Sequence, residues 1–292
     1  MPRAGGEVTR VFEVRPDGPV DPVIVKVYPD RVRWRLAKEV YVYRLLARRG
    51  VTRVPRVLHV EPAGVPALQR AFAVMTLLPG GPLSTVVGEL PAGDLDPVYG
   101  QMGRLLSTVH RIRFPSWGYI VTGIHDPRST NSAYMAAEFA EKLERFADLG
   151  GDSALREAIA VYARGHADLF AACRVPVLCH NDFHEANVLV ADTVLTGCVD
   201  VENAVAADPL LDIARTDYFS IRDSAAKRDA FLRGYGPLPP GWAERVAVYR
   251  LFHAVDHWNH SASAGNRAKL PYAVGDIETM LRGEPLGPWQ AP

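Results

Sequence analysis

The sequence predicts an α+β protein of two lobes, a small N-terminal lobe built on a β-sheet and a larger, mainly helical C-terminal lobe. Three observations lead to this prediction. The 292 residues are enough to bury one or two cores. Strand-like segments dominate the first 80 residues, and helical periodicity dominates the rest. A Pro-Gly-Gly-Pro break at 79–82 separates the two parts, so we expect lobes at 1–80 and 81–292.

Short strands and one helix are expected in the first lobe. Apolar residues gather on both sides of a Pro-Asp-Gly-Pro turn at 16–19, which favours a pair of strands. Trp34, Tyr41 and Leu45 then recur at helical spacing, and Gly50 ends the run. The expected elements are strands at 8–14 and 23–28, a helix at 31–49, and strands at 54–60 and 71–77.

Helical periodicity takes over beyond the break. The exception is a pair of short β-rich segments on either side of a turn at Asp192. The expected elements are helices at 97–112, 132–148, 153–170, 208–220, 223–234 and 241–261, with strands at 188–190 and 197–201. No repeat and no low-complexity tract interrupts this order.

Composition excludes several classes of protein. Lys+Arg and Asp+Glu both number 33, so neither a uniformly basic nucleic-acid binder nor an acidic disordered chain fits. The three cysteines show no CxxC spacing, which favours a reducing compartment. No apolar signal stretch begins the chain, and the longest apolar run, at 71–78, is too short to cross a membrane. We therefore expect a cytoplasmic protein, monomeric or homodimeric, with no nucleic-acid or membrane partner.

Charge is uneven along the chain. Residues 1–80 contain 14 Lys+Arg and 7 Asp+Glu, whereas residues 81–292 contain 19 and 26. A basic first lobe suits an anionic ligand such as a nucleotide, and an acidic second lobe suits a neutral or cationic ligand. A chance distribution of surface charges is the alternative explanation.

The strongest chemical signal is the segment HNDFHEAN at 180–187. Asp182 and Asn187 lie in it, and Asp200 ends the next apolar run thirteen residues after Asn187. Mg²⁺ binds oxygen ligands and usually keeps several of its waters. One amide, one carboxylate and the phosphate oxygens of a nucleotide are therefore enough to hold it. Asp182 can then orient a substrate hydroxyl for in-line attack. The alternative is that Asp182 and Asn187 only cap a turn or a helix.

Lys26 provides a second signal. It is one of 5 lysines against 28 arginines, and it lies inside an apolar strand, where burial requires a partner. Glu39 on the following helix would supply one, and such a pair holds an ammonium against nucleotide phosphates. A solvated lysine on an edge strand is the alternative. Gly5 and Gly6 would let backbone amides approach phosphate, and the absence of a GxxxxGK[ST] sequence excludes a Walker-type site.

These motifs resemble those of the aminoglycoside phosphotransferases (APH) and related small-molecule kinases, which share the protein-kinase fold. The catalytic loop of that family reads roughly HGDxHxxN, to which the segment at 180–187 is similar. Its metal-binding segment ID[WF]E is matched by VDVE at 199–202, and its following DPxxD[LI]A by DPLLDIA at 208–214. The resemblance covers nearly the whole chain and implies a two-lobed, protein-kinase-like fold.

The resemblance also implies a role for each matching residue. The implied roles are catalysis for Asp182, metal binding for Asn187 and Asp200, phosphate binding for Lys26 with Glu39 as its anchor, adenine contact through the linker backbone for Val74, Met75 and Leu77, and support of the catalytic loop for His180 and Asp212. Asn181 replaces the family glycine, and Asn tolerates a left-handed backbone better than most residues. Glu185 and Ala186 replace the usual Pro-Gly, and Val201 replaces an aromatic residue. No catalytic group is lost through these changes.

The acceptor side is less clearly marked in the sequence. His253, His257 and His260 share one helix at a spacing that can bind zinc. The zincin glutamate is absent at Ala254, and a helix face that is part core and part surface explains the spacing as well. The aromatic segment WGY at 117–119 either lines the acceptor pocket or packs under a loop. The candidate substrate contacts are His184, Glu185, Glu202, Asp256, His257 and Trp258.

We therefore expect a phosphotransferase that uses ATP (or GTP) and Mg²⁺ and acts on a hydroxyl of a small molecule. The expected acceptor is an antibiotic of aminoglycoside or nucleoside type, which would give resistance or self-resistance. A metabolic kinase for homoserine, choline or a sugar amine is the alternative. A zinc hydrolase built on His180, Asp182 and His184, and a non-catalytic nucleotide-binding module, are further alternatives. Protein-kinase activity does not fit. No APE segment follows Asp200, and the interval between Asp200 and Asp212 is too short for a full activation loop.

Overall fold

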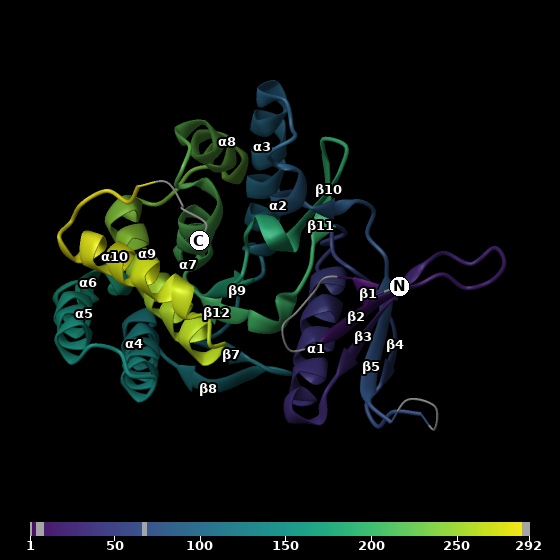
Figure 1. The fold of residues 1–292 in the computed structure, drawn as a ribbon, viewed down its shortest axis with the longest axis horizontal. Coiled ribbons are helices and arrows are strands. Elements are labelled where there is room, and N and C mark those ends of the chain that lie inside the picture. Colours follow the sequence, from purple (N-terminus) through teal and green to yellow (C-terminus); the bar gives the residue numbers. More distant parts are fainter. Residues whose placement is uncertain (1, 4–8, 66–68, 288–292) are drawn as a thin grey trace.

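Strands and helices segregate along the chain as the hydrophobic pattern predicts (Figure 1). The computed structural model describes residues 2–3, 9–65 and 69–287. Gly5 and Gly6, and the first residue of the strand expected at 8–14, lie outside the described residues. In Figure 1 a small lobe with one sheet and one long helix adjoins a larger, mainly helical lobe. The α+β class is confirmed.

The small lobe is a five-stranded antiparallel sheet with one helix packed on it. The strand order is β1-β2-β3-β5-β4, and Lys26 on β3 lies opposite Ala73 on β5. Ala71 and Ala73 face the helix, where they pack with Leu36 and Val40. Lys26 therefore points to the same side as the helix. The elements are β1 (Pro2–Arg3), β2 (Arg10–Val14), β3 (Val23–Tyr28), α1 (Trp34–Arg48), β4 (Val57–Glu61) and β5 (Ala71–Thr76).

Proline shortens β4 relative to the expected strand at 54–60. The strand begins only at Val57, because Pro55 has no N–H for the ladder and restricts the residue before it. Val54 is buried in the main core instead. The helix expected at 31–49 begins as a 3₁₀ turn, Asp30–Val32, and continues as α1.

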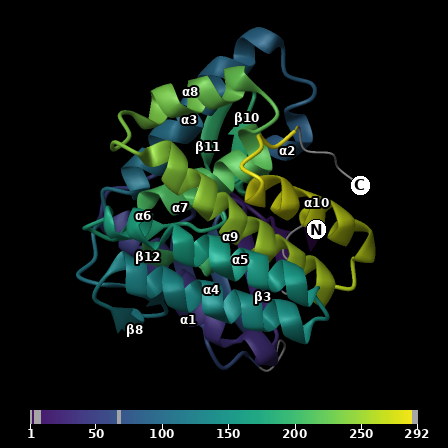
Figure 2. The same cartoon turned by 90° about the vertical axis from the view of Figure 1, so that its left-hand side faces the viewer.

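The helices of the large lobe are arranged around α9, a long central helix (Figure 2). Helices α4, α7 and α10 all pack on α9. Val248, Leu251 and Val255 of α9 are fully buried, as expected for a helix surrounded by others. The helices are α2 (Leu83–Val86), α3 (Ala92–Val109), α4 (Asn131–Asp148), α5 (Ser153–Gly165), α6 (Ala167–Ala171), α7 (Pro209–Thr216), α8 (Ala225–Tyr235), α9 (Trp242–Ser263) and α10 (Leu270–Leu281).

The helical expectations differ from the structure at several points. The helix expected at 97–112 is α3, which begins at Ala92 and ends at Val109. The helix expected at 153–170 is two helices that meet at His166. The helix expected at 208–220 leaves α-helical geometry after Thr216 and continues as a π-helical turn, Asp217–Ile221. The sequence pattern did not predict α10, which carries Pro271 at its start, where a missing N–H costs nothing.

Two small sheets line the junction of the lobes. The first, with order β11-β10-β6, contains the expected hairpin around Asp192, although β11 ends at Cys198 rather than at residue 201. The second, with order β8-β7-β12-β9, was not predicted, because its strands are short and pair across long sequence distances. Their bounds are β6 (Gly81–Pro82), β7 (Trp117–Ile120), β8 (Ile124–Arg128), β9 (Val177–Cys179), β10 (Val188–Ala191), β11 (Val194–Cys198) and β12 (Val205–Ala207).

Glycine lets α3 and α8 cross at backbone contact, and the two helices lie side by side in Figures 1 and 2. A Cβ at Gly103 would lie 2.1 Å from the carbonyl oxygen of Phe231. A Cβ at Gly234 would lie 2.0 Å from the carbonyl oxygen of Gly100. The crossing therefore depends on the absence of side chains at both positions.

The chain passes from the small to the large lobe through a similarly close contact. Gly80 has φ +86°, and a Cβ there would lie 1.9 Å from the carbonyl oxygen of Val190. β6 begins at the next residue and pairs with β10. Among the described helices, none combines the length and apolar character that a membrane crossing requires.

Candidate active site

The loop after β9 is fixed by hydrogen bonds from its backbone to α7. Asp212 accepts hydrogen bonds from the backbone N–H of His180 (2.7 Å) and Asn181 (2.6 Å). His110 also contacts the Asp212 carboxylate, with 3.0 Å between its Nε2 and Oδ2. Asn181 has φ +60°, the left-handed conformation for which Asn is better suited than most residues. The His180 ring lies 3.0 Å from the carbonyl oxygen of Val199.

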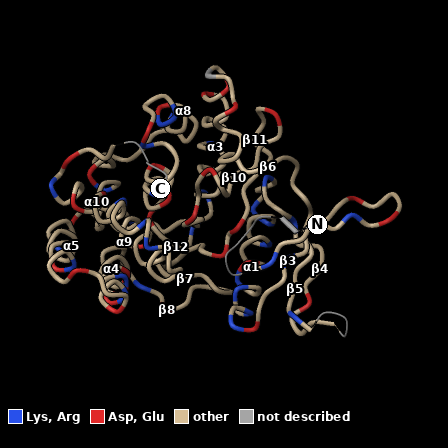
Figure 3. Tube along the Cα trace, in the orientation of Figure 1, with Lys and Arg blue, Asp and Glu red and all other residues tan. Residues whose placement is uncertain are grey.

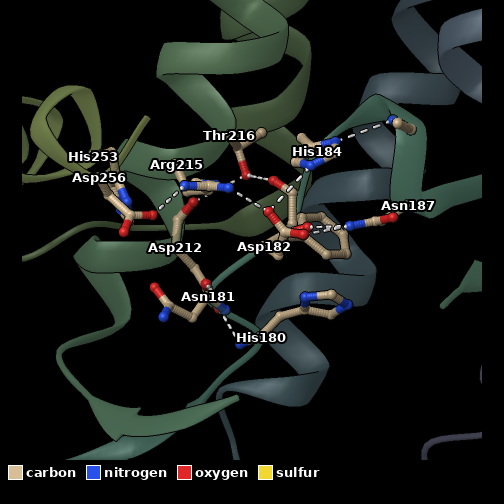
Figure 4. A network of polar contacts seen from close by, with 12 residues as sticks. His180, Asn181, Asp182, His184, Asn187, Asp212, Arg215, Thr216, His253 and Asp256 are labelled. Carbon is tan, nitrogen blue, oxygen red and sulfur yellow. Dashed lines mark hydrogen bonds and ion pairs between the residues drawn. The ribbon is translucent and has the colours of Figure 1, made fainter. Parts of the chain in front are cut away.

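Asp182 lies at the centre of a polar network (Figure 4). Its Oδ1 is 2.5 Å from Nη2 of Arg215 and 3.1 Å from Nε2 of His184. Its Oδ2 accepts a hydrogen bond of 3.0 Å from the side-chain amide of Asn187. Burial would raise the pKa of Asp182, but Arg215 and then His184 hold it well below its usual range. The carboxylate is therefore ionised and held by three donors.

Asn187 and Asp200 are brought together by the backbone. The N–H of Val199 donates to the carbonyl oxygen of Asn187 (2.9 Å). Asp200 follows in the left-handed region, with φ +65°, and its N–H donates to the hydroxyl of Tyr43 on α1 (3.0 Å). The side-chain amide of Asn187 donates hydrogen bonds to the carbonyl oxygen and to the carboxylate of Asp182. Its Oδ1 is left to bind another partner. An amide oxygen beside a carboxylate fits Mg²⁺.

Lys26 is only 5% exposed and is surrounded by carboxylates. Its Nζ lies 3.0 Å from Glu39, 2.9 Å from Asp200 and 3.6 Å from Glu202. Burial alone would lower the pKa of Lys26, but these three carboxylates hold it above its usual value. Carboxylate oxygens of the three acids lie close enough together to share a cation, and Lys26 contacts all of them. The predicted Lys26–Glu39 pair is present in the structure.

A cavity of about 330 Å³ lies between the lobes beside Lys26. Ile24, Met75 and Leu77 form part of its apolar wall, and Asn187 and Asp200 lie at its polar end. Val74 is not among its lining residues, because alternation along β5 turns its side chain the opposite way from Met75. The side chains of Met75 and Leu77 therefore line the cavity and that of Val74 does not, while the backbone contact with adenine implied for this segment stays a prediction.

A second, larger cavity of about 840 Å³ opens on the other side of Asp182. Its walls come from β7, β8, α4, α7 and α9. Asp256 of α9 lies in this wall, with its Oδ1 2.6 Å from Nζ of Lys142 and its Oδ2 3.4 Å from Nη1 of Arg215. Burial would raise the pKa of Asp256, but Lys142 and then Arg215 lower it to about 2. A chain of alternating charges thus runs from α4 to Asp182.

The candidate substrate contacts fall into two groups. His184, Asp256 and His257 line the large cavity, and their contact with a substrate stays a prediction. Glu185 lies outside its lining and accepts a hydrogen bond from the hydroxyl of Tyr99. Glu202 lies on the Lys26 side, where its Oε1 accepts a hydrogen bond of 2.5 Å from Arg35. Glu185 and Glu202 are therefore not placed as acceptor contacts.

Trp258 is also outside the cavity lining. It is buried, and its ring packs against that of Phe146, with centroids 4.2 Å apart. Trp258 is adjacent to His257 on α9, but consecutive residues of a helix point in different directions. His257 therefore faces the large cavity and Trp258 faces the core. The prediction of a substrate contact at Trp258 is therefore corrected to a core packing role.

The three histidines of α9 do not gather around a common point. His253 is buried with Nε2 2.9 Å from the carbonyl oxygen of Leu211, whereas His257 and His260 line the large cavity. Burial lowers the pKa of His253 to about 4. Among the described residues, no cluster with metal-ligand geometry includes a histidine of α9. The structure thus supports the mixed core–surface interpretation of this helix.

The segment WGY divides between core and cavity. Trp117 is buried, and Gly118 and Tyr119 line the large cavity. Beneath Tyr119 lies Lys38 of α1, fully buried, with Nζ 3.3 Å from the centre of the Tyr119 ring. The Nζ has no hydrogen-bond partner among the described residues, and burial lowers its pKa to about 6.

Sequence reasoning missed Arg215 and the charged residues of α4. Arg215 follows Asp212 by three residues, so both lie on the face of α7 that meets the catalytic loop. That spacing was the available signal. Lys142 and Glu138 lie on successive turns of α4, but nothing in their local sequence indicates that α4 faces the loop at 180–187.

The two-lobed fold, with a buried Lys–Glu pair and Asp182 between two cavities, defines a small-molecule kinase with a protein-kinase-like architecture. The chain belongs to the phosphotransferase enzyme family APH, whose sequence profile matches residues 1–246. The family resemblance is thereby confirmed. No curated protein gives a significant match.

Solved structures share this fold. A thermostable mutant of aminoglycoside phosphotransferase APH(4)-Ia, in a ternary complex with AMP-PNP and hygromycin B, has a TM-score of 0.73 at 21% identity, over 97% of this chain and 92% of that one. A candidate fructosamine-3-kinase from Thermobifida fusca has a TM-score of 0.70 at 22% identity, over 97% and 93%. The streptomycin–ATP complex of APH(2″)-IIa has a TM-score of 0.64 at 15% identity, over 97% and 91%.

Proposed function

We propose that this protein transfers the γ-phosphate of ATP, with Mg²⁺, to a hydroxyl group of a small hydrophilic molecule. One observation carries the proposal. Asp182 faces the large cavity, while Asn187, which donates to its Oδ2, lines the small cavity with Asp200. A phosphoryl group leaving the small cavity would therefore meet an acceptor hydroxyl beside Asp182.

The small cavity is the proposed nucleotide site. Met75 and Leu77 would contact the adenine, and Lys26, kept charged by Glu39, would contact the phosphates. Asn187 and Asp200 would hold Mg²⁺, which when bound neutralises charge on the phosphate oxygens. The structures of relatives bound to AMP-PNP and ATP support this assignment. GTP has no comparable support.

Asp182 is the proposed catalytic residue. Its ionised carboxylate would accept a hydrogen bond from the acceptor hydroxyl and align that oxygen for in-line attack on phosphorus. Arg215 and His184 hold Oδ1, so the carboxylate keeps one orientation while the acceptor binds. His180 and Asp212 would support the loop and touch neither substrate.

The acceptor is proposed to be an antibiotic or a metabolic sugar derivative. Relatives of the same fold include an enzyme bound to hygromycin B and a candidate fructosamine-3-kinase. The large cavity, about 840 Å³, is in the upper part of the range for small-molecule sites and suits an acceptor of this size. Resistance or self-resistance would follow from an antibiotic acceptor.

The test is nucleotide consumption with Mg²⁺ across a panel of aminoglycosides, nucleosides, macrolides and metabolic alcohols. Mass spectrometry should show a product that has gained one phosphoryl group. Asp182→Asn should lower kcat by roughly 10²–10⁴-fold, because the group that orients the hydroxyl loses its charge. The matched control is Asp192→Asn, in the β10–β11 turn, which should retain full activity. Equal activity in Asp182→Asn and the wild type would refute the assignment.

A further inference from the structure

The charge balance of the large cavity bears on which acceptor it takes. Its lining contains five carboxylates and four permanently cationic side chains among the described residues. The carboxylates are Asp126, Glu138, Glu141, Asp182 and Asp256, and the cations are Arg128, Lys142, Arg145 and Arg215. Figure 3 shows both signs along α4. This composition differs from a cleft lined by acids alone.

Most of these charges are already paired within the protein. Lys142 lies 2.6 Å from Asp256, and Arg215 lies 2.5 Å from Asp182. Arg128 pairs with Asp126 at 2.6 Å. Because the pairs of Asp182 and Asp256 are partly buried and formed without a ligand, these two carboxylates are not free to bind an incoming ammonium, whereas the exposed Arg128–Asp126 pair only balances charge. Displacing Lys142 or Arg215 would leave a partly buried cation without its partner, which is costly.

Three charged side chains of α4 remain. Arg145 donates a hydrogen bond of 2.5 Å to the hydroxyl of Ser263, and Glu138 and Glu141 form no ion pair within the described part of the chain. Burial raises the pKa of Glu138 to about 7, so this carboxyl is partly protonated near neutral pH. The uncompensated charge in the cavity is therefore about one negative unit or less.

Uncharged polar groups supply the rest of the polar lining. Asn203, Asn259, Ser263 and Tyr119 lie in the wall, together with imidazoles such as His125. Amides and hydroxyls both donate and accept hydrogen bonds, as do the hydroxyl groups of a sugar-like ligand. Burial and then Arg215 lower the pKa of His257 to about 4, so its ring adds no positive charge at neutral pH.

We infer that the acceptor is a hydroxyl-rich molecule that carries at most one positive charge, and that polycations are excluded from this cavity. The inference rests on the proposed function and narrows it. Recognition comes through hydrogen bonds to hydroxyl groups, and a single ammonium, where the acceptor has one, lies against the α4 wall at Glu138 and Glu141. A polycationic aminoglycoside would meet Asp182 and Asp256 already neutralised by Arg215 and Lys142, and too little remaining negative charge to balance its ammonium groups.

The test compares two probes that differ in charge. Kanamycin, a polyamine, and its fully N-acetylated derivative carry the same hydroxyl groups. Their dissociation constants are measured by calorimetry at physiological salt, with the wild type and with Arg128→Glu/Arg145→Glu. This double variant makes the lining more acidic and leaves the chain Lys142–Asp256–Arg215 untouched. The control, Arg48→Glu/Arg156→Glu, makes the same change in total charge at exposed positions outside the cavity.

We expect the wild type to bind kanamycin no more tightly than the acetylated derivative. Arg128→Glu/Arg145→Glu should gain at least about tenfold in affinity for kanamycin, since two side-chain charges change sign close to the ligand. The control should gain nothing. Wild-type protein that binds kanamycin about tenfold more tightly than the derivative, with an affinity that falls as salt rises, would overturn the inference.

The variant also decides the case in which neither probe binds the wild type. A gain of kanamycin binding in Arg128→Glu/Arg145→Glu would show that charge balance excludes the polycation, and no gain would overturn the inference. Calorimetry needs no phosphoryl transfer. A failure of the proposed function, seen as no nucleotide consumption with any acceptor, is therefore distinguishable from a failure of this inference.

Discussion

Asp182 shows how single residues from distant segments determine the state of a functional group. Arg215 comes from α7, and His184 and Asn187 come from the catalytic loop, yet all three donors converge on one carboxylate. Burial without them would favour the protonated acid. The same balance between burial and pairing governs Asp256, whose pKa is lowered to about 2 after burial is outweighed by Lys142 and Arg215.

His253 should make the stability of the protein depend on pH. Burial lowers its pKa from 6.5 to about 4. Acid therefore protonates the unfolded chain first, and the contribution of His253 is complete above pH 6.5 and lost as the pH falls towards about 4. Between pH 7 and pH 4.5 this loss is about 2 kcal/mol. Urea unfolding at the two pH values measures it.

A glutamine at position 253 separates this effect from general acid denaturation. His253→Gln retains a donor for the carbonyl oxygen of Leu211 but does not titrate. Its loss of stability between the two pH values should be smaller than that of the wild type by about 2 kcal/mol. His59→Gln, at an exposed position, should behave as the wild type. Identical pH dependence in His253→Gln and the wild type would contradict the assignment.

At the scale of elements, the contact between α3 and α8 depends on glycine. Gly103→Ala would place a methyl group against the backbone of Phe231, at a spacing that side chains never adopt. We expect the free energy of unfolding to fall by at least about 2 kcal/mol, because backbone on both sides must move. Gly93→Ala, in the first turn of the same helix, where a Cβ would meet no other described segment within 4 Å, should instead leave it unchanged or raise it by up to about 0.5 kcal/mol. Equal effects of the two substitutions in denaturant titrations would show that the crossing is not tight.

Elements with strong local periodicity were the ones that the sequence predicted best. β3 matches its expected bounds, and α4 and α9 differ from theirs by at most two residues at either end. The sheet of β8, β7, β12 and β9 was missed because strands of three to five residues carry too little pattern. β12 pairs with β7 and β9, which lie far from it in the sequence, so no local pattern of residues indicates this pairing.

At the scale of the whole molecule, the small cavity joins the lobes. Ile24 and Met75 of the small lobe and Leu189 and Asp200 of the large lobe line the same space. We propose that the lobes divide at 1–80 and 81–292, with the hinge at 74–80, where β5 ends and the chain passes Gly80. A ligand in this cavity contacts both lobes, so its binding free energy should stabilise them together.

Nucleotide binding should therefore raise the unfolding temperature in a single transition. At about 100 times its Kd, ATP with Mg²⁺ should add about 2.7 kcal/mol to the free energy of unfolding. Lys26→Gln should lose most of this increment, because the charge that we place against the phosphates is gone. Lys269→Gln, which lines neither cavity, should keep it. Calorimetry that resolved two transitions, of which nucleotide moved only one, would contradict the shared site.

The chemistry of the site was more predictable than its specificity. The sequence singled out Lys26, Glu39, Asn187 and Asp200 from their local context, and all four line the small cavity. The acceptor wall is different. It combines side chains of β7, β8, α4 and α9, whose relative placement depends on tertiary packing. Glu185, Glu202 and Trp258 were therefore expected in this wall but lie outside it, and Arg215 was overlooked.

Lys26 and Lys38 are both buried, but we expect different sequence variation at the two positions among homologous proteins. Lys26 balances three carboxylates, and its replacement would leave them uncompensated. Lys38 has no hydrogen-bond partner in the described part of the chain, and burial lowers its pKa to about 6, so its amine is mostly uncharged at neutral pH. Methionine would keep the contact with the ring of Tyr119 without a buried amine. Among homologous sequences we expect position 38 to drift between lysine and long apolar residues, while position 26 remains lysine.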